Sequence, residues 1–320
     1  MYIDNDLFSS AETDRDYTGG LAVTLSGQRA QEFLLSTDSW LDAIDRWVRF
    51  DTLYKKSPHF QLHSFEYGFT LFTPRDTSIA EPILDDHPYA SLFFIANTEQ
   101  TVIPANKFSY QSTLTLGILG LPVAEDVQTS IHKLTGTALP QGWENQISYG
   151  GEPTAKYTVS VQKTLTNIYR EGRSDYDIKA NLEGNIGYST DINAGFAGRW
   201  GRINTPWWSF NPHQAEYINL GAPVVADKLE GSKSEFYFWA GFNIKYRFYN
   251  AILQGQFRDS AVTFSRDQLE SVIYEGWTGI TREFGTGLNV SFFVRGRTEE
   301  IKGPNARKPL WGGFIFSKSY

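Results

Sequence analysis

The chain has 320 residues with a formal net charge of -7, and none of them is a cysteine, which excludes disulfides and a thiolate nucleophile. The acidic balance, without any run of Lys or Arg, argues against a nucleic-acid partner. A mean hydropathy of -0.36, with no apolar stretch near the ~18 residues that a membrane helix needs, excludes a helical membrane protein but leaves a membrane barrel open.

Alternation of apolar and polar residues predicts strands from one end of the chain to the other. The twelve segments with this pattern are residues 2–8, 20–25, 65–72, 91–98, 110–118, 157–165, 178–188, 192–200, 236–248, 271–282, 290–297 and 310–316. Several reach the ~9–11 residues of a tilted membrane strand. Any one of them would also suit a soluble sandwich.

The positions of aromatic residues favour the membrane barrel. The segment Phe236–Phe242 opens with aromatics, as an interface girdle does, and the chain ends on the aromatics Phe314, Phe316 and Tyr320. We therefore expect an all-β protein with a single domain over residues 1–320, a transmembrane antiparallel up-and-down β-barrel of about 12 strands. A bacterial outer membrane is its expected location. The first residues carry no signal segment, so either the protein is cytosolic or such a segment was removed, and the barrel requires the second alternative.

Two segments break the strand pattern and are predicted as helices. Residues 29–49 have helical spacing of apolar residues among charges. Residues 123–136 follow Pro122 and end on Gly136, the usual punctuation of a helix. Gln128 and His132 lie four residues apart on this second helix, so they project from one face. Residues 201–234 are expected to be an irregular loop or plug, without an assigned function.

The polar motifs gather in loops that an even-stranded barrel brings to one rim. With both termini at one end, the loops after the first, third and fifth strands meet at the other end; these are residues 9–17, 73–88 and 119–153. We expect this rim to face outward from the cell and to carry the active site.

His132 is the candidate base among five histidines, because histidine titrates near neutral pH and this one has a polar partner one helical turn away. A lone helical histidine is more often a surface or packing residue. No Gly-x-Ser-x-Gly motif is present, so water is the simpler nucleophile. Backbone N–H groups near Gly19 and Gly20, or a bound cation, would stabilise the oxyanion. Acids near the N-terminus could hold calcium, and they are Asp4, Asp6, Glu12 and Asp14.

These residues form an ordered series of motifs. The series is Asn5-Asp6-x-Phe8, Thr13-Asp14-Arg15-Asp16-Tyr17-Thr18-x-Gly20, Tyr67-Gly68, Thr73-Pro74, Pro88-Tyr89-Ala90, Leu116-Gly117, Gln128-x-x-x-His132 and Gly142-Trp143-x-x-Gln146-Ile147. It resembles the LpxR family of outer-membrane lipid A 3'-O-deacylases over roughly residues 3–147. The resemblance implies a twelve-stranded barrel that hydrolyses the ester of the 3'-linked acyloxyacyl group of lipid A, the anchor of lipopolysaccharide, with calcium as cofactor.

The resemblance also implies the site residues: His132 as base for water, with Gln128, Asn5, Asp6 and Thr18, and Asp6 as a calcium ligand. Three positions depart from the family pattern. Ala138 stands where the family has a carboxylate, Arg75 is the nearest cation to a family lysine, and His87 replaces an arginine. A non-catalytic barrel and a general outer-membrane phospholipase are the alternative functions. The sequence indicates nothing about oligomeric state or about which acyl chain is cleaved.

Overall fold

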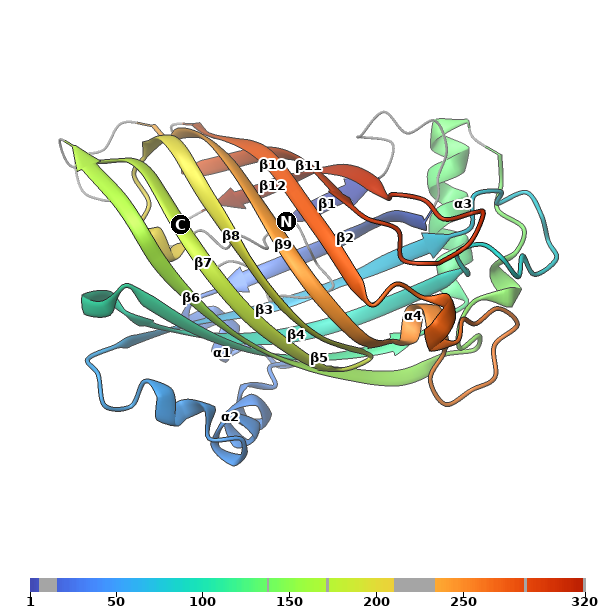
Figure 1. Cartoon of the computed structure of the whole chain (residues 1–320), viewed down its shortest axis with the longest axis horizontal. Helices are drawn as coiled ribbons and strands as arrows, with labels where there is room; N and C mark the ends of the chain where they lie inside the picture. The colour runs from blue at the N-terminus through green and yellow to red at the C-terminus, as the bar shows by residue number, and fades with distance from the viewer. Residues whose placement is uncertain (6–15, 137, 171–172, 210–233, 285–286, 319–320) are drawn as a thin grey trace.

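The computed structural model describes residues 1–5, 16–136, 138–170, 173–209, 234–284 and 287–318. Their strands form one closed antiparallel barrel in which each strand pairs with its neighbours in sequence and β1 pairs with β12 (Figure 1). The strands are β1 (Tyr2–Asn5), β2 (Asp16–Ser26), β3 (Phe60–Thr73), β4 (Ala90–Ile103), β5 (Phe108–Leu119), β6 (Glu152–Arg170), β7 (Arg173–Gly187), β8 (Ser189–Ile203), β9 (Phe236–Asn250), β10 (Val272–Phe284), β11 (Leu288–Arg297) and β12 (Leu310–Lys318). The predicted fold class is confirmed, with a strand at each of the twelve predicted segments.

Both termini lie at one end of the barrel. The N-terminal amine of Met1 donates to the backbone oxygen of Phe316 at 2.7 Å, across the seam between β1 and β12. Successive antiparallel strands then send the loops after β1, β3, β5, β7, β9 and β11 to the opposite end. We call these two ends the terminus end and the loop rim.

Side-chain alternation is inverted relative to a soluble protein, with apolar residues outside and polar residues inside. On β9 the outward residues Phe238, Phe242 and Ile244 are exposed, whereas the intervening Asn243 and Lys245 are buried in the interior. The exposed apolar residues match a lipid-facing belt, because a membrane barrel presents this face to hydrocarbon.

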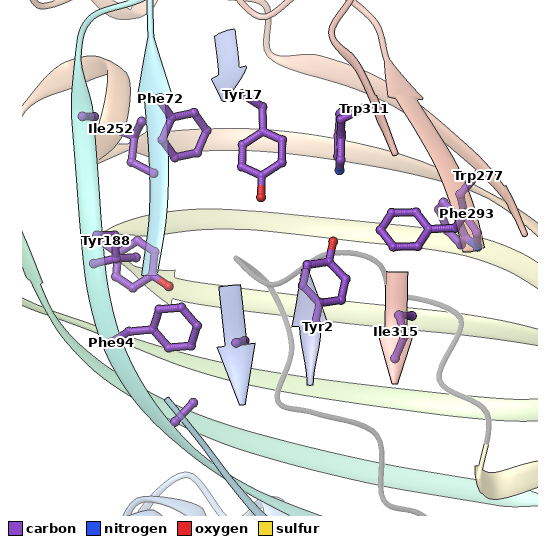
Figure 2. Close-up of a cluster of buried hydrophobic side chains, with 14 of the residues drawn as sticks. Tyr2, Tyr17, Phe72, Phe94, Tyr188, Ile252, Trp277, Phe293, Trp311 and Ile315 are labelled. Atoms are coloured by element: carbon purple, nitrogen blue, oxygen red, sulfur yellow. The ribbon is translucent and has the colours of Figure 1, made fainter. Parts of the chain in front are cut away.

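Aromatic side chains pack in the barrel interior at the level of the seam. Figure 2 shows aromatic side chains of distant strands meeting there, among them Tyr2, Tyr17, Phe293 and Trp311. The rings of Tyr17 and Trp311 meet edge to face with centroids 5.2 Å apart, and those of Tyr2 and Phe293 stack at 5.6 Å. These contacts connect β1 and β2 to β11 and β12 from inside, in addition to the strand pairing on both edges of β1.

The helices lie outside the strand pattern and divide between the two ends (Figure 1). At the terminus end, β2 is connected to β3 by α1 (Gln28–Gln31), α2 (Asp38–Trp47) and the 3-10 helix η2 (Phe50–Leu53). At the loop rim lie α3 (Val123–Thr135) and α4 (Ala251–Gln254). Short 3-10 helices occur at both ends, at Pro104–Asn106 and Trp207–Ser209 on the terminus end and at Trp143–Asn145 and Arg266–Gln268 on the loop rim. Among the described residues, none of these helices has the length and apolar character to cross a membrane.

The prediction of one helix over residues 29–49 was wrong. Ser36 and Thr37 interrupt it because both bind Asn97 on the barrel wall: the Asn97 side-chain amide donates to Ser36 Oγ at 3.0 Å, and Thr37 Oγ1 donates to Asn97 Oδ1 at 2.9 Å. The predicted helix over residues 123–136 is confirmed, with Pro122 before it and Gly136 after it in a left-handed conformation with φ 74°. Of the first predicted strand only residues 2–5 are described, and residues 210–233 of the predicted irregular segment lie outside the described residues.

Candidate active site

Helix α3 packs against the outer side of the barrel wall near the loop rim, not into the lumen. Its residues Ala124 and Val127 join a cluster with Leu71, Tyr89 and Trp143. Leu71 faces outward because it keeps the alternation of the exposed Tyr67, four residues earlier on β3. The helix therefore lies on the lipid-facing side of β3 and β4, with Figure 1 placing it beside the ends of these strands.

Asn5 and Thr18 lie at the same rim and on the same outer face. Strand register places Asn5 opposite Gly19, and Gly19 opposite Leu71, in one row across β1, β2 and β3. A bulge between Tyr17 and Gly19 frees Thr18 from this pairing, and Thr18 Oγ1 bonds Thr73 Oγ1 at 2.7 Å. Neighbouring strands are ~5 Å apart, so two strand spacings separate Asn5 from the wall under α3.

Gly19 is required at its position in this row. Its φ is 154°, a conformation that favours glycine, and a Cβ there would lie 2.6 Å from the Asp4 backbone oxygen. The same Cβ would lie 3.1 Å from Asn5 Nδ2, so the amide of Asn5 lies directly beside Gly19. The close approach leaves the Asn5 side chain at the outer surface of β2.

His132 and Gln128 are both buried, at 3% and 1% exposure, and each has a defined partner. Helix α3 ends at Gly136, which has a left-handed conformation and donates its N–H to the His132 backbone oxygen at 2.8 Å. The chain then turns back, and the Ala138 backbone oxygen lies within hydrogen-bond distance of His132 Nδ1. A proton on Nδ1 is the one that can bond a carbonyl oxygen, which makes Nε2 the nitrogen able to accept a proton. Trp143 Nε1 donates to Gln128 Oε1 at 2.7 Å and fixes the amide.

Two sequence-predicted positions turn away from this face. Asp4, proposed for calcium, points into the barrel, where it is 3% exposed and accepts hydrogen bonds from Tyr2 at 2.5 Å and from Tyr17. That expectation was wrong because strand alternation sends Asp4 inward when Asn5 faces outward. A Cβ on Gly20 would also meet interior atoms, Tyr17 Oη at 2.9 Å, and the Gly20 N–H bonds Asp4, so Gly20 faces the barrel interior.

Asp6, Glu12 and Asp14 lie outside the described residues, so their predicted roles stay predictions. Among the residues that the structure describes, no three His, Asp or Glu side chains gather in a way that could hold a metal ion. Beside Gly19 at the outer face, the described side-chain oxygens of Asn5, Thr18 and Thr73 are neutral. The described part of the site by itself does not fit calcium.

A charged clamp at the rim was missed by the sequence analysis. Arg307, between β11 and β12, donates to Asp16 at 2.7 Å and also to Asp86. Burial alone would raise the pKa of Asp86, but the Arg307 guanidinium and two backbone N–H groups hold that pKa below its usual value. Because 291 residues separate Arg307 from Asp16, no local pattern could have indicated the pairing.

The positions that depart from the family pattern have defined surroundings. The His87 ring stacks on Phe72 with centroids 5.4 Å apart, and its Nδ1 lies 2.8 Å from the Pro88 backbone oxygen. Ala138 contributes its carbonyl oxygen to His132 in place of any side-chain function. The Arg75 backbone N–H donates to Asp86 at 2.9 Å, which joins this segment to the Arg307 clamp.

Comparison with known proteins gives the family. The model of the family described as "Outer membrane protein LpxR" matches residues 1–320. The chain belongs to the LpxR family. Like other members of that family, it is an outer-membrane protein, and the predicted family and location are confirmed. No curated protein matches the chain.

A solved structure agrees with this fold. LpxR from Salmonella typhimurium superposes with a TM-score of 0.71 at 17% identity, over 96% of this chain and 90% of that one. The β domain of the Bordetella autotransporter BrkA reaches a TM-score of 0.39 at 10% identity, over 82% of this chain and 83% of that one. A bacterial polysaccharide outer-membrane secretin reaches 0.30 at 8% identity, covering 100% and 96%. Only the first of these likenesses is close enough to support the LpxR barrel.

Proposed function

We propose that the protein is an outer-membrane ester hydrolase that removes the 3'-linked acyloxyacyl group of lipid A, with its loop rim facing outward from the cell. The observation that carries the proposal is the position of α3, which buries His132 and Gln128 against the lipid-facing side of the wall. A substrate held in a leaflet by its acyl chains reaches this side by lateral diffusion. A site inside the lumen would have no such access.

The chemistry follows from the orientation of one imidazole. With Nδ1–H on the Ala138 carbonyl, His132 accepts a proton from water at Nε2, and the resulting hydroxide attacks the ester carbonyl carbon. The tetrahedral oxyanion needs donors on the outer face, for which we propose the Gly19 N–H and the Asn5 amide. Its collapse expels the sugar alkoxide, which takes the proton from His132 and leaves as the alcohol, with the fatty acid as second product.

Calcium remains part of the proposal, with Asp6 as the expected carboxylate ligand beside Asn5. A hard cation would polarise the ester carbonyl. The described residues do not supply a complete ligand set, so no step is assigned to the ion. Removal of calcium by a chelator, followed by its return, tests this part by itself.

The first prediction concerns His132→Gln. Removing the base should lower acyl release by at least about 100-fold, because general-base catalysis contributes that much or more. Purified protein in detergent is incubated with lipid A, with and without calcium, and mass spectrometry follows the released fatty acid. The heat-modifiable gel band should persist, because His132 lies on a loop helix and supports no strand.

His59→Gln is the matched control. It also has Nδ1 beside a backbone carbonyl, Ser57 O at 2.8 Å, but lies at the terminus end of the barrel. Undiminished release by His132→Gln would reject the proposal. Release from phosphatidylethanolamine instead of lipid A would identify a phospholipase. Absence of release from both substrates by the unaltered protein would favour a non-catalytic barrel, the candidate that Ala138 supports.

A further inference from the structure

Helix α2 lies on the outside of the barrel wall at the terminus end, where the proposed function gives it no role. Asp45 accepts hydrogen bonds from Ser112 at 2.6 Å and from Tyr157 at 2.5 Å, on β5 and β6. Thr37, just before the helix, donates to Asn97 on β4 at 2.9 Å. Asn97 pairs with Phe65, two residues from the exposed Tyr67, so these wall residues face outward. The helix is thus fastened to the lipid-facing side of three strands.

The wall changes character where the helix meets it. Along β4 the outward positions run Phe93 and Ile95, then Asn97 and Glu99. The apolar belt therefore ends at Ile95 on this side of the barrel, and polar residues follow toward the terminus end. Helix α2 and its flanks cover that polar wall, with Tyr54 donating to Glu99 at 3.3 Å. Helix α2 therefore lies at the level where the hydrocarbon layer of the membrane ends, because the apolar belt of the barrel ends there.

The face that α2 turns away from the wall is apolar and aromatic. Trp40 and Trp47 lie seven residues apart on this face and are 60% and 83% exposed. Four further apolar side chains are exposed in the segment formed by α2 and its flanks, residues 34–56: Leu34, Leu35, Val48 and Leu53. Tryptophan with one apolar and one polar edge is enriched where hydrocarbon meets headgroups.

The charges of the segment are divided between its two sides. Asp45 and Asp51 are buried and Asp38 and Asp42 are half-buried, whereas Arg46, Arg49 and Lys56 are exposed. A helix with acids against the protein and bases beside exposed tryptophans presents a surface that is complementary to lipid phosphate. An ordinary soluble surface helix would instead leave its acids in water.

We propose that α2 lies in the phospholipid headgroup layer at the terminus end of the barrel, with Trp40 and Trp47 at the hydrocarbon boundary and Arg46 and Arg49 on lipid phosphates. Continuity favours lipid over a protein partner, since the exposed apolar face continues the lipid-facing belt of the barrel. The helix then fixes the height of the barrel in the membrane. This inference depends on the membrane barrel and is independent of the enzymatic proposal.

The absence of cysteine allows a direct test by single labels. In the variant Trp47→Cys, a nitroxide is attached to the new cysteine, and the protein is reconstituted into vesicles of phosphatidylethanolamine and phosphatidylglycerol. Collision rates with oxygen, which concentrates in hydrocarbon, and with a water-soluble nickel chelate give the depth of the label. Lys308→Cys, at an exposed side chain of the loop rim, is the water reference, and Phe242→Cys, in the belt, is the hydrocarbon reference.

The oxygen-to-nickel ratio at position 47 should lie between the two references and severalfold above that of position 308. Leu34→Cys, 94% exposed in the same segment, should behave likewise and guards against a local effect of the label. A heat-modifiable band verifies that each variant is folded. Ratios at both positions equal to that of position 308 would overturn the proposal and leave the face to a protein partner.

Discussion

At the residue scale, the candidate site depends on how single side chains are oriented by backbone groups and by a glycine. Ala138 illustrates this, because its side chain departs from the family pattern while its carbonyl oxygen binds His132 Nδ1. Gly19 likewise acts through what it lacks, since any Cβ would displace the Asn5 amide. A backbone group can therefore keep a site in order when the side chain at that position has changed.

Gln128→Leu tests whether the hydrogen bond between Trp143 and Gln128 holds α3 in place. Trp143 Nε1, in a side chain only 1% exposed, would lose its acceptor, at a cost of about 1–3 kcal/mol. We expect faster amide hydrogen exchange in α3 and weaker packing of the helix on Leu71. Gln128→Glu keeps an oxygen acceptor and should restore protection. Equal exchange in the leucine variant and the unaltered protein would show that this bond does not hold the helix.

At the element scale, ion pairs between loops hold the rim around the site. Glu300, after β11, accepts from Arg247 of β9 at 2.6 Å and lies 3.4 Å from Arg297. The same Arg247 donates to the Glu270 backbone oxygen at 2.9 Å, which joins the loop after β9 to the loop after β11. Together with the Arg307 clamp, these pairs connect loops from distant parts of the chain.

The pH dependence of rim stability follows from Glu300. Burial would raise the pKa of Glu300, but the charges of Arg297 and Arg247 lower it from 4.5 to about 2. A depressed carboxyl pKa stabilises the fold above pH 4.5, and that contribution is lost as pH falls toward 2. At neutral pH it amounts to at most about 3 kcal/mol.

Urea midpoints measured from neutral to acid pH check this prediction. Glu300→Gln should lower the midpoint at neutral pH and have a progressively smaller effect toward pH 2. A constant difference between the variant and the unaltered protein across the whole range would contradict the assigned pKa. Lys308→Ala is the control, since its pair with Glu299 is exposed and 3.7 Å long and should contribute less than about 1 kcal/mol at any pH.

At the scale of the whole molecule, stability depends on closing the sheet between its first and last strands. Among the described residues, Tyr2–Asn5 of β1 pairs with residues 312–315 of β12 along this seam. The seam is closely packed, and Gly313 of β12 lies opposite both Asp4 and Phe293. A Cβ at Gly313 would lie 2.6 Å from Asp4 Cβ and 2.7 Å from the Phe293 ring.

Gly313→Ala tests this closure. The added methyl should destabilise the barrel by about 1–3 kcal/mol, seen as a lower urea midpoint and less heat-modifiable protein. Gly276→Ala, on β10, is the matched control, because the nearest atom to its Cβ would be 3.8 Å away. Equal midpoints for the two variants would mean that the seam tolerates expansion and is not the weak point of the fold.

The strands, the inverted alternation and the helix bearing Gln128 and His132 could be predicted from the sequence, because they depend on neighbours within a few residues. Tertiary structure alone decided that α3 packs on the outer wall, that Asp4 faces inward, and that Ser36 and Thr37 break the first helix at Asn97. The Arg307 clamp and the exposed face of α2 belong to the same group. Each of these features depends on which strand comes to lie beside which segment once the sheet closes, and local periodicity carries no information about such pairings.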